Sequence, residues 1–430
     1  MPTTATAASR WYVLIVLAIG NAVAGADRAV LAAVLPLLKD EFGFSDTQLG
    51  LLTGYGSALS YALLAAVIAR VADRHGKSRV IAFCLLLWSA SVALIGACTK
   101  FWTFAVARFA AGIGPAGVWP VGQALISDHF PPERRSGALA IHTAGDYAGG
   151  ALPLIAGGWI ATHYGWRAAF YAVAIPGIVL AAVQWFTIRD RDAPLPVTAM
   201  EPALPADVSW RAGLRTLLES RSFVHIVLGF AWASFAVYGL SQWMPTFYHR
   251  QFGLAPDAAA SIFGGGYGLG ALLGLLLGGA FGNWLAAKDP ARLVGFCMVT
   301  FLLTFPAISL VLFAPNVTVA FAAHVAAIMF GSMPSGPLYA LVQNSVPPHL
   351  RAFASSVFLV TLTLFGAGGG PLLIGIFSDT LAPSLGEQSL TYSMFLVKLL
   401  GVMLFLHLSL AIKHVRADMA AAAIARNQAS

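Results

Sequence analysis

Apolar runs of about 20 residues recur along this chain, and they constrain its fold more than any other feature. A helix of that length crosses the hydrocarbon core of a bilayer. Of the 430 residues, 58% are hydrophobic and only 10% are charged, whereas soluble chains carry about 25% charged residues. Because lipid offers no partner for a bare backbone, each run must be an α-helix. The sequence therefore predicts an all-α protein that spans a membrane many times.

Twelve spans are predicted, in two groups of six. They cover 11–38, 48–70, 78–98, 102–127, 137–162 and 166–188, then 223–250, 257–284, 291–314, 316–343, 351–378 and 392–413. We expect an N-terminal six-helix bundle at 1–188, a cytoplasmic linker at 189–222, a C-terminal six-helix bundle at 223–414 and a cytoplasmic tail at 415–430. The linker carries four prolines, and its end, Asp207 to Leu218, favours a short amphipathic surface helix. Two related bundles with a substrate site between them are typical of transporters.

The basic residues lie unevenly over the predicted loops. Most fall on one side, and four fall on the other: Lys39, Lys100, Arg167 and Arg250. Because loops rich in Lys and Arg stay in the cytoplasm, we expect a multi-pass protein of the cytoplasmic (inner) membrane with both termini inside. The net charge of +7 follows from this topology, so no nucleic-acid partner is expected.

The first and fourth predicted spans contain charged residues well inside their apolar runs: Asp27 and Arg28 in the first, and Arg108 in the fourth. A charge at a helix centre costs about 2.5–3.5 kcal/mol on insertion scales, so each needs a function or a partner. At about 1.5 Å per residue, Asp27 and Arg108 reach comparable depths, and contact between them is feasible. We predict an anion site made by the two arginines, which can grip a carboxylate or phosphate. The alternative is a buried ion pair that only fixes packing.

Asp27 is the predicted titratable counter-ion of that site. Desolvation raises the pKa of a carboxyl and a nearby arginine lowers it. An anion that draws an arginine away from Asp27 would therefore make proton uptake easier. This predicts proton-coupled transport of an organic anion.

The loop Ala69–Arg79 resembles the loop between the second and third helices of major facilitator superfamily transporters, Gly-x-x-x-Asp-Arg-x-Gly-Arg-Lys. Asp73, Arg74 and Gly76 match that pattern. Ala69 stands in place of its Gly, and Lys77 in place of its Arg. The resemblance implies 12 transmembrane helices in two pseudo-symmetric six-helix bundles, alternating access, and a cytoplasmic gate at Asp73, Arg74, Gly76 and Lys77.

Two branches of that family resemble the chain over its full length: the anion:cation symporters of sugar acids and other carboxylates, and the spinster-like transporters associated with lysophospholipids and sphingolipids. The first span and Arg108 fit both, whereas 341–356 and 370–379 are more similar to the spinster-like branch. Seven residues after Arg108, where both branches carry a proton-binding Glu, this chain has Pro115. Asp146 in the fifth span is a candidate replacement, with His142 one turn earlier on the same face.

The second half of the chain has few charges in its spans. Its candidate substrate contacts are aromatic or amide side chains: Tyr238, Gln242, Trp243, Tyr267 and Gln343. Packing or an interfacial belt is the alternative explanation for the aromatic ones. Lys398, near the outer end of the twelfth span, is expected to extend to the interface. The first half would then hold charge and coupling, and the second would fit the body of the substrate.

Several enzyme-like patterns lack their required context. The run 112–117 fits Gly-x-Gly-x-x-Gly but lies in the membrane with no preceding strand. The three cysteines, Cys84, Cys98 and Cys297, form neither a metal spacing nor a disulfide framework. We therefore expect no enzyme, no cofactor and no metal, and a protein that acts as a monomer.

The sequence thus predicts a secondary active transporter of a carboxylate-bearing small molecule. The alternatives are a spinster-like transporter of lysophospholipids or other amphiphiles, and a pH-independent uniporter or exchanger. A sensor built on a transporter fold is the alternative from a different class.

Overall fold

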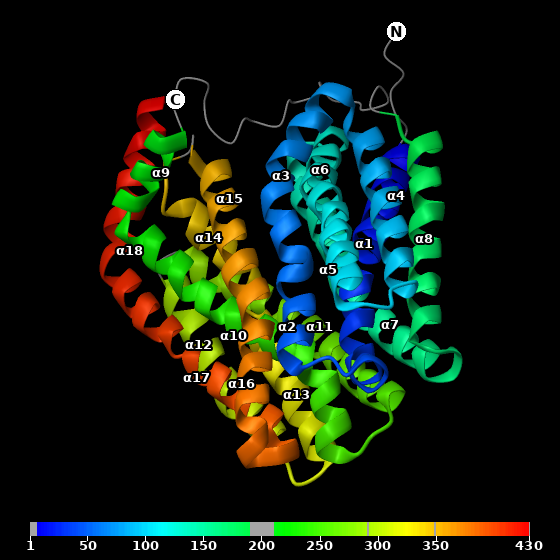
Figure 1. Cartoon of the computed structure of the whole chain (residues 1–430). Coiled ribbons are helices and arrows are strands. Elements are labelled where there is room, and N and C mark those ends of the chain that lie inside the picture. The colour runs from blue at the N-terminus through cyan, green and yellow to red at the C-terminus, as the bar shows by residue number, and fades with distance from the viewer. Residues whose placement is uncertain (1–6, 190–209, 290–291, 348–349, 430) are drawn as a thin grey trace. The chain divides into compact units, whose positions relative to one another are not determined.

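The computed structural model describes residues 7–189, 210–289, 292–347 and 350–429, and no β-strand occurs in these ranges. The helices before residue 200 are α1 (Ala7–Phe42), α2 (Asp46–Thr53), α3 (Tyr55–His75), α4 (Lys77–Gly96), α5 (Phe101–Ala111), α6 (Ile113–His129), α7 (Pro132–Tyr164) and α8 (Trp166–Thr187). Those that follow are α9 (Trp210–Glu219), α10 (Arg221–Phe252), α11 (Pro256–Lys288), α12 (Arg292–Leu312), α13 (Val317–Ser332), α14 (Ser335–Asn344), α15 (Arg351–Thr361), α16 (Gly369–Leu385), α17 (Ser389–Leu400) and α18 (Met403–Ala429). Figure 1 shows the order along the chain.

The chain divides into two compact units. The first unit consists of Met1–Met200 with Gln242–Gly265, and the second of Glu201–Ser241 with Gly266–Ser430. The boundaries differ from a simple division of the sequence, because α10 and α11 both pass from one unit to the other. The tip of the α10–α11 hairpin, residues 242–265, therefore belongs to the first unit.

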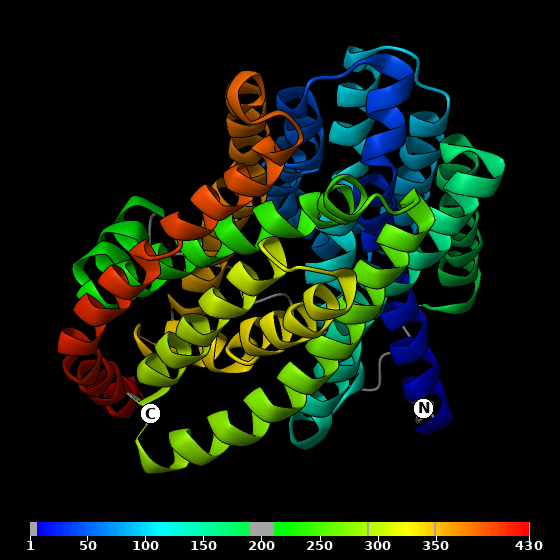
Figure 2. The ribbon, with the colours of Figure 1, turned by 90° about the horizontal axis from the view of Figure 1, so that it is seen from below.

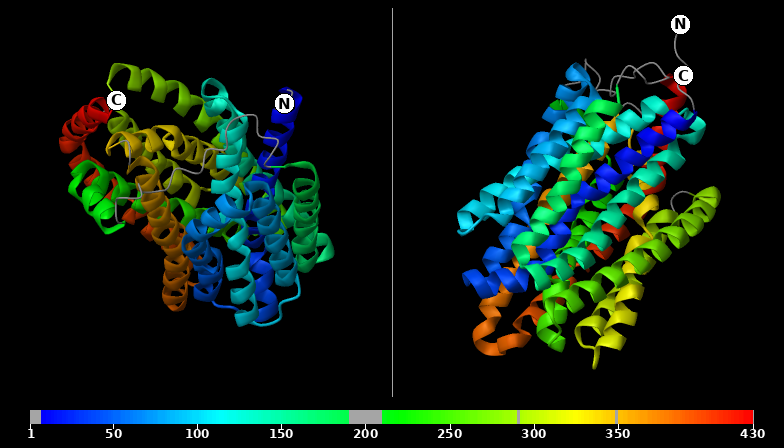
Figure 3. Two further views of the ribbon diagram at one scale, coloured as in Figure 1. Left: turned by 90° about the horizontal axis from the view of Figure 1, so that it is seen from above. Right: turned by 90° about the vertical axis from the view of Figure 1, so that its right-hand side faces the viewer.

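In the first unit, α1 lies along α7 and α4 lies along α8 (Figure 3). Aliphatic side chains of α1, α4 and α6 form a buried core there, with Leu14, Leu85 and Val121 among its members. In the second unit, α12 packs on α13 and α16 on α17 (Figure 2). Its core contains Phe230, Cys297 and Phe358.

The predicted multi-pass all-α fold is confirmed. Ten segments of the described residues are long and apolar enough to cross a membrane. One of them, Phe353–Asp418, contains the twelfth predicted span and all but the first two residues of the eleventh. The predicted fifth span lies within α7, a continuous helix of 33 residues.

Several predicted spans are interrupted helices. The second predicted span is divided at Gly54 into α2 and α3, and the fourth at Gly112 into α5 and α6. The eleventh contains a π-helical turn, Leu362–Gly368, between α15 and α16. Such interruptions free backbone groups inside a membrane, so they occur where protein surrounds them. π-helical turns such as this one are frequent at functional sites.

Most of the predicted linker, 190–209, lies outside the described residues. From Trp210 on, α9 covers the segment predicted as an amphipathic helix, and it buries Gly213 and Leu217 while exposing Trp210. Part of the predicted tail is helical, since α18 continues to Ala429.

Candidate functional site: two ion pairs in the first unit

Asp27 lies in α1 with only 2% of its surface exposed. Its Oδ2 pairs with Nη1 of Arg108 from α5. Its Oδ1 accepts a hydrogen bond of 3.1 Å from the indole Nε1–H of Trp88 in α4. Both carboxylate oxygens therefore have a donor, and the charge of Asp27 is balanced within the protein.

Arg108 is completely buried. Besides Asp27, its guanidinium donates to Oγ of Ser57 over 3.3 Å and, through Nε, to the carbonyl of Leu52 over 3.4 Å. A buried charge is tolerated when it is paired and its remaining N–H groups find acceptors. We call Asp27 and Arg108 the closed pair. Together with Trp88 and Ser57, which bond to it, this pair connects α1, α3, α4 and α5.

Trp88 has its place because small residues face it. A Cβ atom added at Gly114 would lie 2.4 Å from Cβ of Trp88, and one at Gly177 would lie 2.8 Å from the indole ring. Any side chain at these positions would displace the indole. The glycines of α6 and α8 therefore set where the hydrogen bond to Asp27 forms.

Arg28 and Asp146 form a second, looser pair. Nη2 of Arg28 lies 3.9 Å from Oδ1 of Asp146, and the two side chains are 39% and 43% exposed. That distance exceeds a normal hydrogen bond, so the attraction is mainly Coulombic. We call Arg28 and Asp146 the open pair, because both side chains are partly exposed.

Close packing of α7 on α1 positions Asp146. A Cβ at Gly145 would lie 2.4 Å from the carbonyl oxygen of Ala18, and one at Gly149 would lie 2.1 Å from that of Ala22. These two glycines sit on either side of Asp146 in sequence and let the helix backbones touch. The carboxylate is thereby brought to the level of Arg28, with Oδ1 3.9 Å from Nη2 of the guanidinium.

Asp27 and Arg28 are neighbours in sequence, yet they take part in different pairs. Successive side chains on a helix point about 100° apart, because there are about 3.6 residues per turn. Asp27 thus points toward α4 and α5, and Arg28 toward α7. Asp27 is enclosed, whereas the next residue of α1 is partly exposed.

His142 lies one turn before Asp146 on α7 and is fully buried. Among the described residues neither of its ring nitrogens has a hydrogen-bond partner. Its ring lies 5.5 Å from that of Trp119, and its backbone carbonyl accepts a hydrogen bond from Asn21. An imidazole held this way keeps its hydrogen-bonding capacity unused in this state.

Comparison with known proteins identifies the chain. The model of the Major Facilitator Superfamily matches residues 17–371, which include both ion pairs. The chain belongs to the Major Facilitator Superfamily. It is 31% identical over 90% of its length to an MFS-type efflux pump of Mycolicibacterium smegmatis, covering 89% of that protein. It is 23% identical over 84% of its length to the cis,cis-muconate transport protein of Acinetobacter baylyi, covering 83% of it.

A solved structure narrows the family further. A bacterial homologue of the human lysosomal transporter Spinster, in an inward-facing and occupied conformation, matches with a TM-score of 0.83 and 26% identity, over 95% of this chain and 98% of that one. The chain is therefore a multi-pass membrane transporter of the superfamily's spinster-like branch.

Pro115 stands at the position where the resemblance to the two branches implies a proton-binding Glu. It is the third residue of α6, immediately after the interruption at Gly112. A proline in the first turn of a helix gives up no intrahelical hydrogen bond, since those N–H groups have no partner in the helix. The interruption of the fourth span therefore explains how a proline is accommodated here.

The predicted gate residues divide into exposed and buried ones. Asp73 and Arg74 are exposed at the end of α3. Gly76 joins α3 to α4 with φ +96°, a conformation that favours glycine. Lys77, in contrast, is 4% exposed, and its ammonium lies 2.7 Å from Oδ2 of the buried Asp128 at the end of α6.

The predicted substrate contacts of α10 and α11 are distributed over both units. Gln242 belongs to the first unit and donates to the carbonyl of Thr53 over 3.5 Å, and the adjacent Trp243 has no exposed surface. Tyr238, in the second unit, is 43% exposed. Tyr267 of α11 is half-buried.

Two further residues of the second unit stand apart from those predictions. Gln343 is exposed in the last turn of α14, where its carbonyl accepts a hydrogen bond from Arg351. Lys398 is 6% exposed in α17, so the prediction that it extends to the interface is wrong. Packing of α17 on α12 and α16 encloses the ammonium instead of releasing it.

The sequence did not predict the two side chains that bond to the closed pair, Trp88 and Ser57. Trp88 is one of the 11 tryptophans of the chain and lies in an apolar run. Ser57 is one of many small polar residues. Neither carries a charge, and charge was the signal that singled out Asp27 and Arg108. Only the fold brings the indole and the hydroxyl to the ion pair.

Proposed function

We propose that this transporter moves an organic anion together with protons, using Arg28 as the anion contact and Asp146 as the proton carrier. The observation that supports this assignment is the open pair. Arg28 and Asp146 are both partly exposed, and the contact between them is a Coulombic one of 3.9 Å. A solute carboxylate that reaches the guanidinium can therefore compete with Asp146 for it.

Coupling follows from competition for Arg28. A carboxylate bound bidentately to the guanidinium is closer and better aligned than Asp146. When Arg28 turns to the anion, Asp146 loses the cation that stabilises its ionised form, and it takes up a proton more readily. His142, one turn away with unused ring nitrogens, is placed to accept or pass on that proton. Anion and proton would then bind together.

The closed pair has a different role in this scheme. The charge of Arg108 is balanced by Asp27, and both groups are buried. In the described state they hold α1 against α4 and α5, and so they orient Arg28, the next residue of α1. We propose that Arg108 and Asp27 contribute to the anion site only in a state in which this pair has opened.

The solute class rests on the arginine and on the relatives. A guanidinium suits a carboxylate or a phosphate. A relative named as a cis,cis-muconate transport protein supports a dicarboxylate-like solute. A relative named as an efflux pump supports export of the anion. Alternating access also permits uptake, because the mechanism works in both directions.

The experiment is transport by purified protein in liposomes, with and without an imposed pH gradient, of cis,cis-muconate, aromatic acids and sugar acids. We expect the gradient to drive one of these anions, Arg28→Gln to abolish its movement, and Asp146→Asn to abolish the dependence on the gradient. Glu41→Gln is the matched control, because Glu41 pairs with Arg167 at the same exposure, 39% each, away from the site. A gradient-driven anion flux that persists in Asp146→Asn would disprove the coupling role.

A lysophospholipid is the second candidate solute. A relative named as a probable sphingolipid transporter, a spinster homologue of Arabidopsis thaliana, favours a lipid solute. Including a fluorescent lysophosphatidic acid and its uncharged monoacylglycerol analogue in the same liposomes separates the two candidates. Arg28-dependent movement of the phosphate-bearing lipid, with no flux of small carboxylates, would replace the small organic anion as substrate.

A further inference from the structure

Two histidines of the second unit face each other where α10 packs on α18. Nδ1 of His225 lies 3.1 Å from Nδ1 of His407, within hydrogen-bond distance. The ring centroids are 5.4 Å apart, further than the nitrogens by about the two ring radii, so the two nitrogens point at each other. Both side chains are half-buried. Neither histidine takes part in the two ion pairs of the first unit.

A glycine and a side-chain cap bring the two helices together here. A Cβ atom added at Gly229 would lie 3.3 Å from Cδ2 of Leu408 and 3.4 Å from Cβ of His407. Further along α18, Oδ2 of Asp418 accepts a hydrogen bond of 2.9 Å from the N–H of Ser222, the second residue of α10. That N–H group has no acceptor within its own helix, so the carboxylate acts as a cap. The start of α10 is thus bonded to α18 at two points.

A hydrogen bond between two Nδ1 atoms needs a donor on one side and an acceptor on the other. A neutral imidazole carries its proton on one nitrogen and accepts with the other, so two neutral rings can bond. A pair with one imidazolium can bond as well, because the charged ring donates to the neutral one. When both rings are charged, both Nδ1 atoms are donors and neither can accept. The bond between His225 and His407 therefore breaks when the second ring takes up its proton.

The surroundings of the pair add to the cost of charging both rings. Arg221, one turn before His225 on α10, and His414, two turns after His407 on α18, lie close enough to act on His225 electrostatically. Asp418, one turn beyond His414, already accepts hydrogen bonds as the cap of α10. Two adjacent imidazolium ions repel each other, and Arg221 adds to that repulsion.

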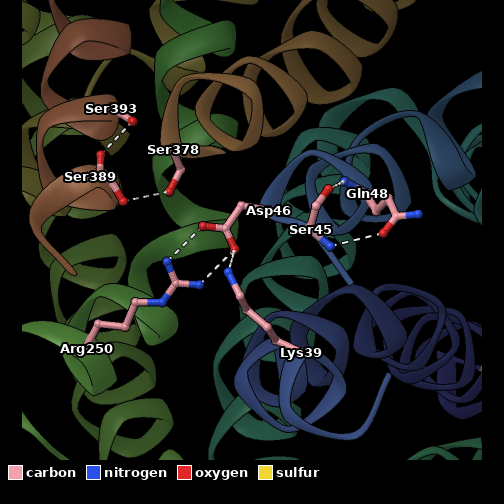
Figure 4. A network of polar contacts seen from close by, with 8 residues as sticks. All are labelled: Lys39, Ser45, Asp46, Gln48, Arg250, Ser378, Ser389 and Ser393. Carbon is pink, nitrogen blue, oxygen red and sulfur yellow. Dashed lines mark hydrogen bonds and ion pairs between the residues drawn. The ribbon is translucent and has the colours of Figure 1, made fainter. Parts of the chain in front are cut away.

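A carboxylate cluster of the first unit shows the contrast. Asp46, at the start of α2, lies 2.6 Å from Nζ of Lys39 and 2.8 Å from each of the two terminal nitrogens of Arg250 (Figure 4). Carboxylate, ammonium and guanidinium groups ordinarily keep their charges from about pH 5 to about pH 8, whereas histidine changes its charge in that range. The pair of His225 and His407 is therefore built from the side chain that responds to pH near neutrality.

We propose that His225 and His407 form a proton-sensitive clasp, which holds the start of α10 on α18 while at least one imidazole is neutral and releases it when both are charged. α10 is continuous from Arg221 to Phe252 and passes from the second unit to the first. Release of its start therefore changes the restraint on a helix that both units share. Mildly acidic pH would thus alter the transporter independently of any proton carried with the solute. The clasp does not rest on the anion or the proton carrier of the proposed function.

Asparagine is the informative replacement at this pair. Its side-chain amide is close in reach to Nδ1 of histidine, and it can donate and accept at any pH. His225→Asn should therefore keep a bond to His407 at neutral and at acidic pH, whereas His225→Leu removes the bond at both. His163→Asn is the matched control, because Nδ1 of His163 lies 2.9 Å from the carbonyl of Trp159, one turn earlier in α7 of the first unit.

The test measures the separation of α10 and α18 and needs no substrate. Spin labels at Leu228→Cys and Ser409→Cys, both exposed, flank the contact of Gly229 with Leu408. Dipolar broadening of their electron spin resonance spectrum in lipid nanodiscs reports the separation. The native cysteines are free and buried, and the protein without introduced cysteines, treated with the same label, supplies the background.

The comparison is made at about pH 7.5 and about pH 5.5, roughly one unit on either side of the ordinary value for histidine. In the parent we expect the ratio of close to separated label pairs to fall at least about tenfold at the acidic pH, and to recover on return to the neutral one. His163→Asn should respond as the parent does. His225→Asn should keep the labels close at both pH values, and His225→Leu should separate them at both.

Two results would overturn the clasp. In the first, the labels of the parent stay equally close at the acidic pH, which would mean that the pair does not hold α10 on α18. In the second, His225→Asn shows the same separation at the acidic pH as the parent, because a group other than His225 and His407 would then be the one that takes up the proton.

Discussion

The interiors of the two units differ in how they use charge. In the first unit, Asp27 and Arg108, and Lys77 and Asp128, are buried ion pairs, and Asp46 is a buried acid with two cations. In the described part of the second unit, the buried polar side chains are hydroxyls, the imidazole of His324 and one ammonium, Lys398, with no buried acid. Buried ion pairs therefore occur in the interior of the first unit, whereas the interior of the described part of the second unit is formed mainly by apolar side chains and hydroxyls.

The difference indicates which residues make the two units respond differently when a contact breaks. Burying an ion is costly unless the partner is close and well oriented, and removing one partner costs more than the pair is worth. Each buried pair therefore has two discrete states, made or broken. Hydroxyls bonded to their own helix backbone, such as Ser393 to Ser389 and Thr304 to Thr300, have no such alternative.

Breaking the closed pair should have the largest effect. Arg108→Ala leaves Asp27 buried without its cation, and we expect a loss of about 3–5 kcal/mol in stability and no transport. Thermal unfolding in detergent, followed by the loss of the monodisperse species, measures this. The double variant Asp27→Asn/Arg108→Met removes both charges and should recover most of the stability without recovering transport. An Arg108→Ala protein as stable as the parent would contradict a buried pair.

Neutralising the open pair should affect coupling and spare stability. Asp146→Asn removes one member of a half-exposed contact, so the expected loss of stability is under about 1 kcal/mol. Its unfolding temperature should match that of the parent, while anion flux no longer responds to a pH gradient. A large destabilisation would mean that Asp146 belongs with the closed pair.

Removing the indole N–H should have an intermediate structural effect. Trp88→Phe keeps the ring but leaves Oδ1 of Asp27 without its donor, at an expected cost of about 1–3 kcal/mol. Trp88→His, which can restore a donor, tests whether the hydrogen bond or the ring volume matters. Transport that Trp88→His restores better than Trp88→Phe would identify the bond as the important feature.

The smallest effect is expected in the second unit. Lys398→Met replaces a buried ammonium by an apolar side chain of similar length, which should be neutral or slightly stabilising. Anion flux should be unchanged, as measured in the same liposomes. Loss of flux in Lys398→Met would show that the charges needed for transport are not confined to the first unit, because the second unit would then contribute one.

Hydropathy and charge placement were enough to predict much of this protein. Runs too long for a soluble core required membrane helices, and the matches at Asp73, Arg74 and Gly76 indicated the family. The same criteria could not show that the fourth predicted span breaks at Gly112, since glycine is common in all these spans. They also misjudged Lys398, because exposure depends on which helices pack around it.

The sequence by itself determined that this chain is an all-α membrane transporter, and that Asp27, Arg28, Arg108 and Asp146 need partners or functions. Those conclusions depend on local composition and on the cost of placing charge in lipid. Only the tertiary structure decided which acid meets which base. The partners lie 81 residues apart in the closed pair and 204 apart between Asp46 and Arg250. One residue of offset along α1 sends neighbouring side chains to different helices, so pairing follows from helix packing and not from sequence distance.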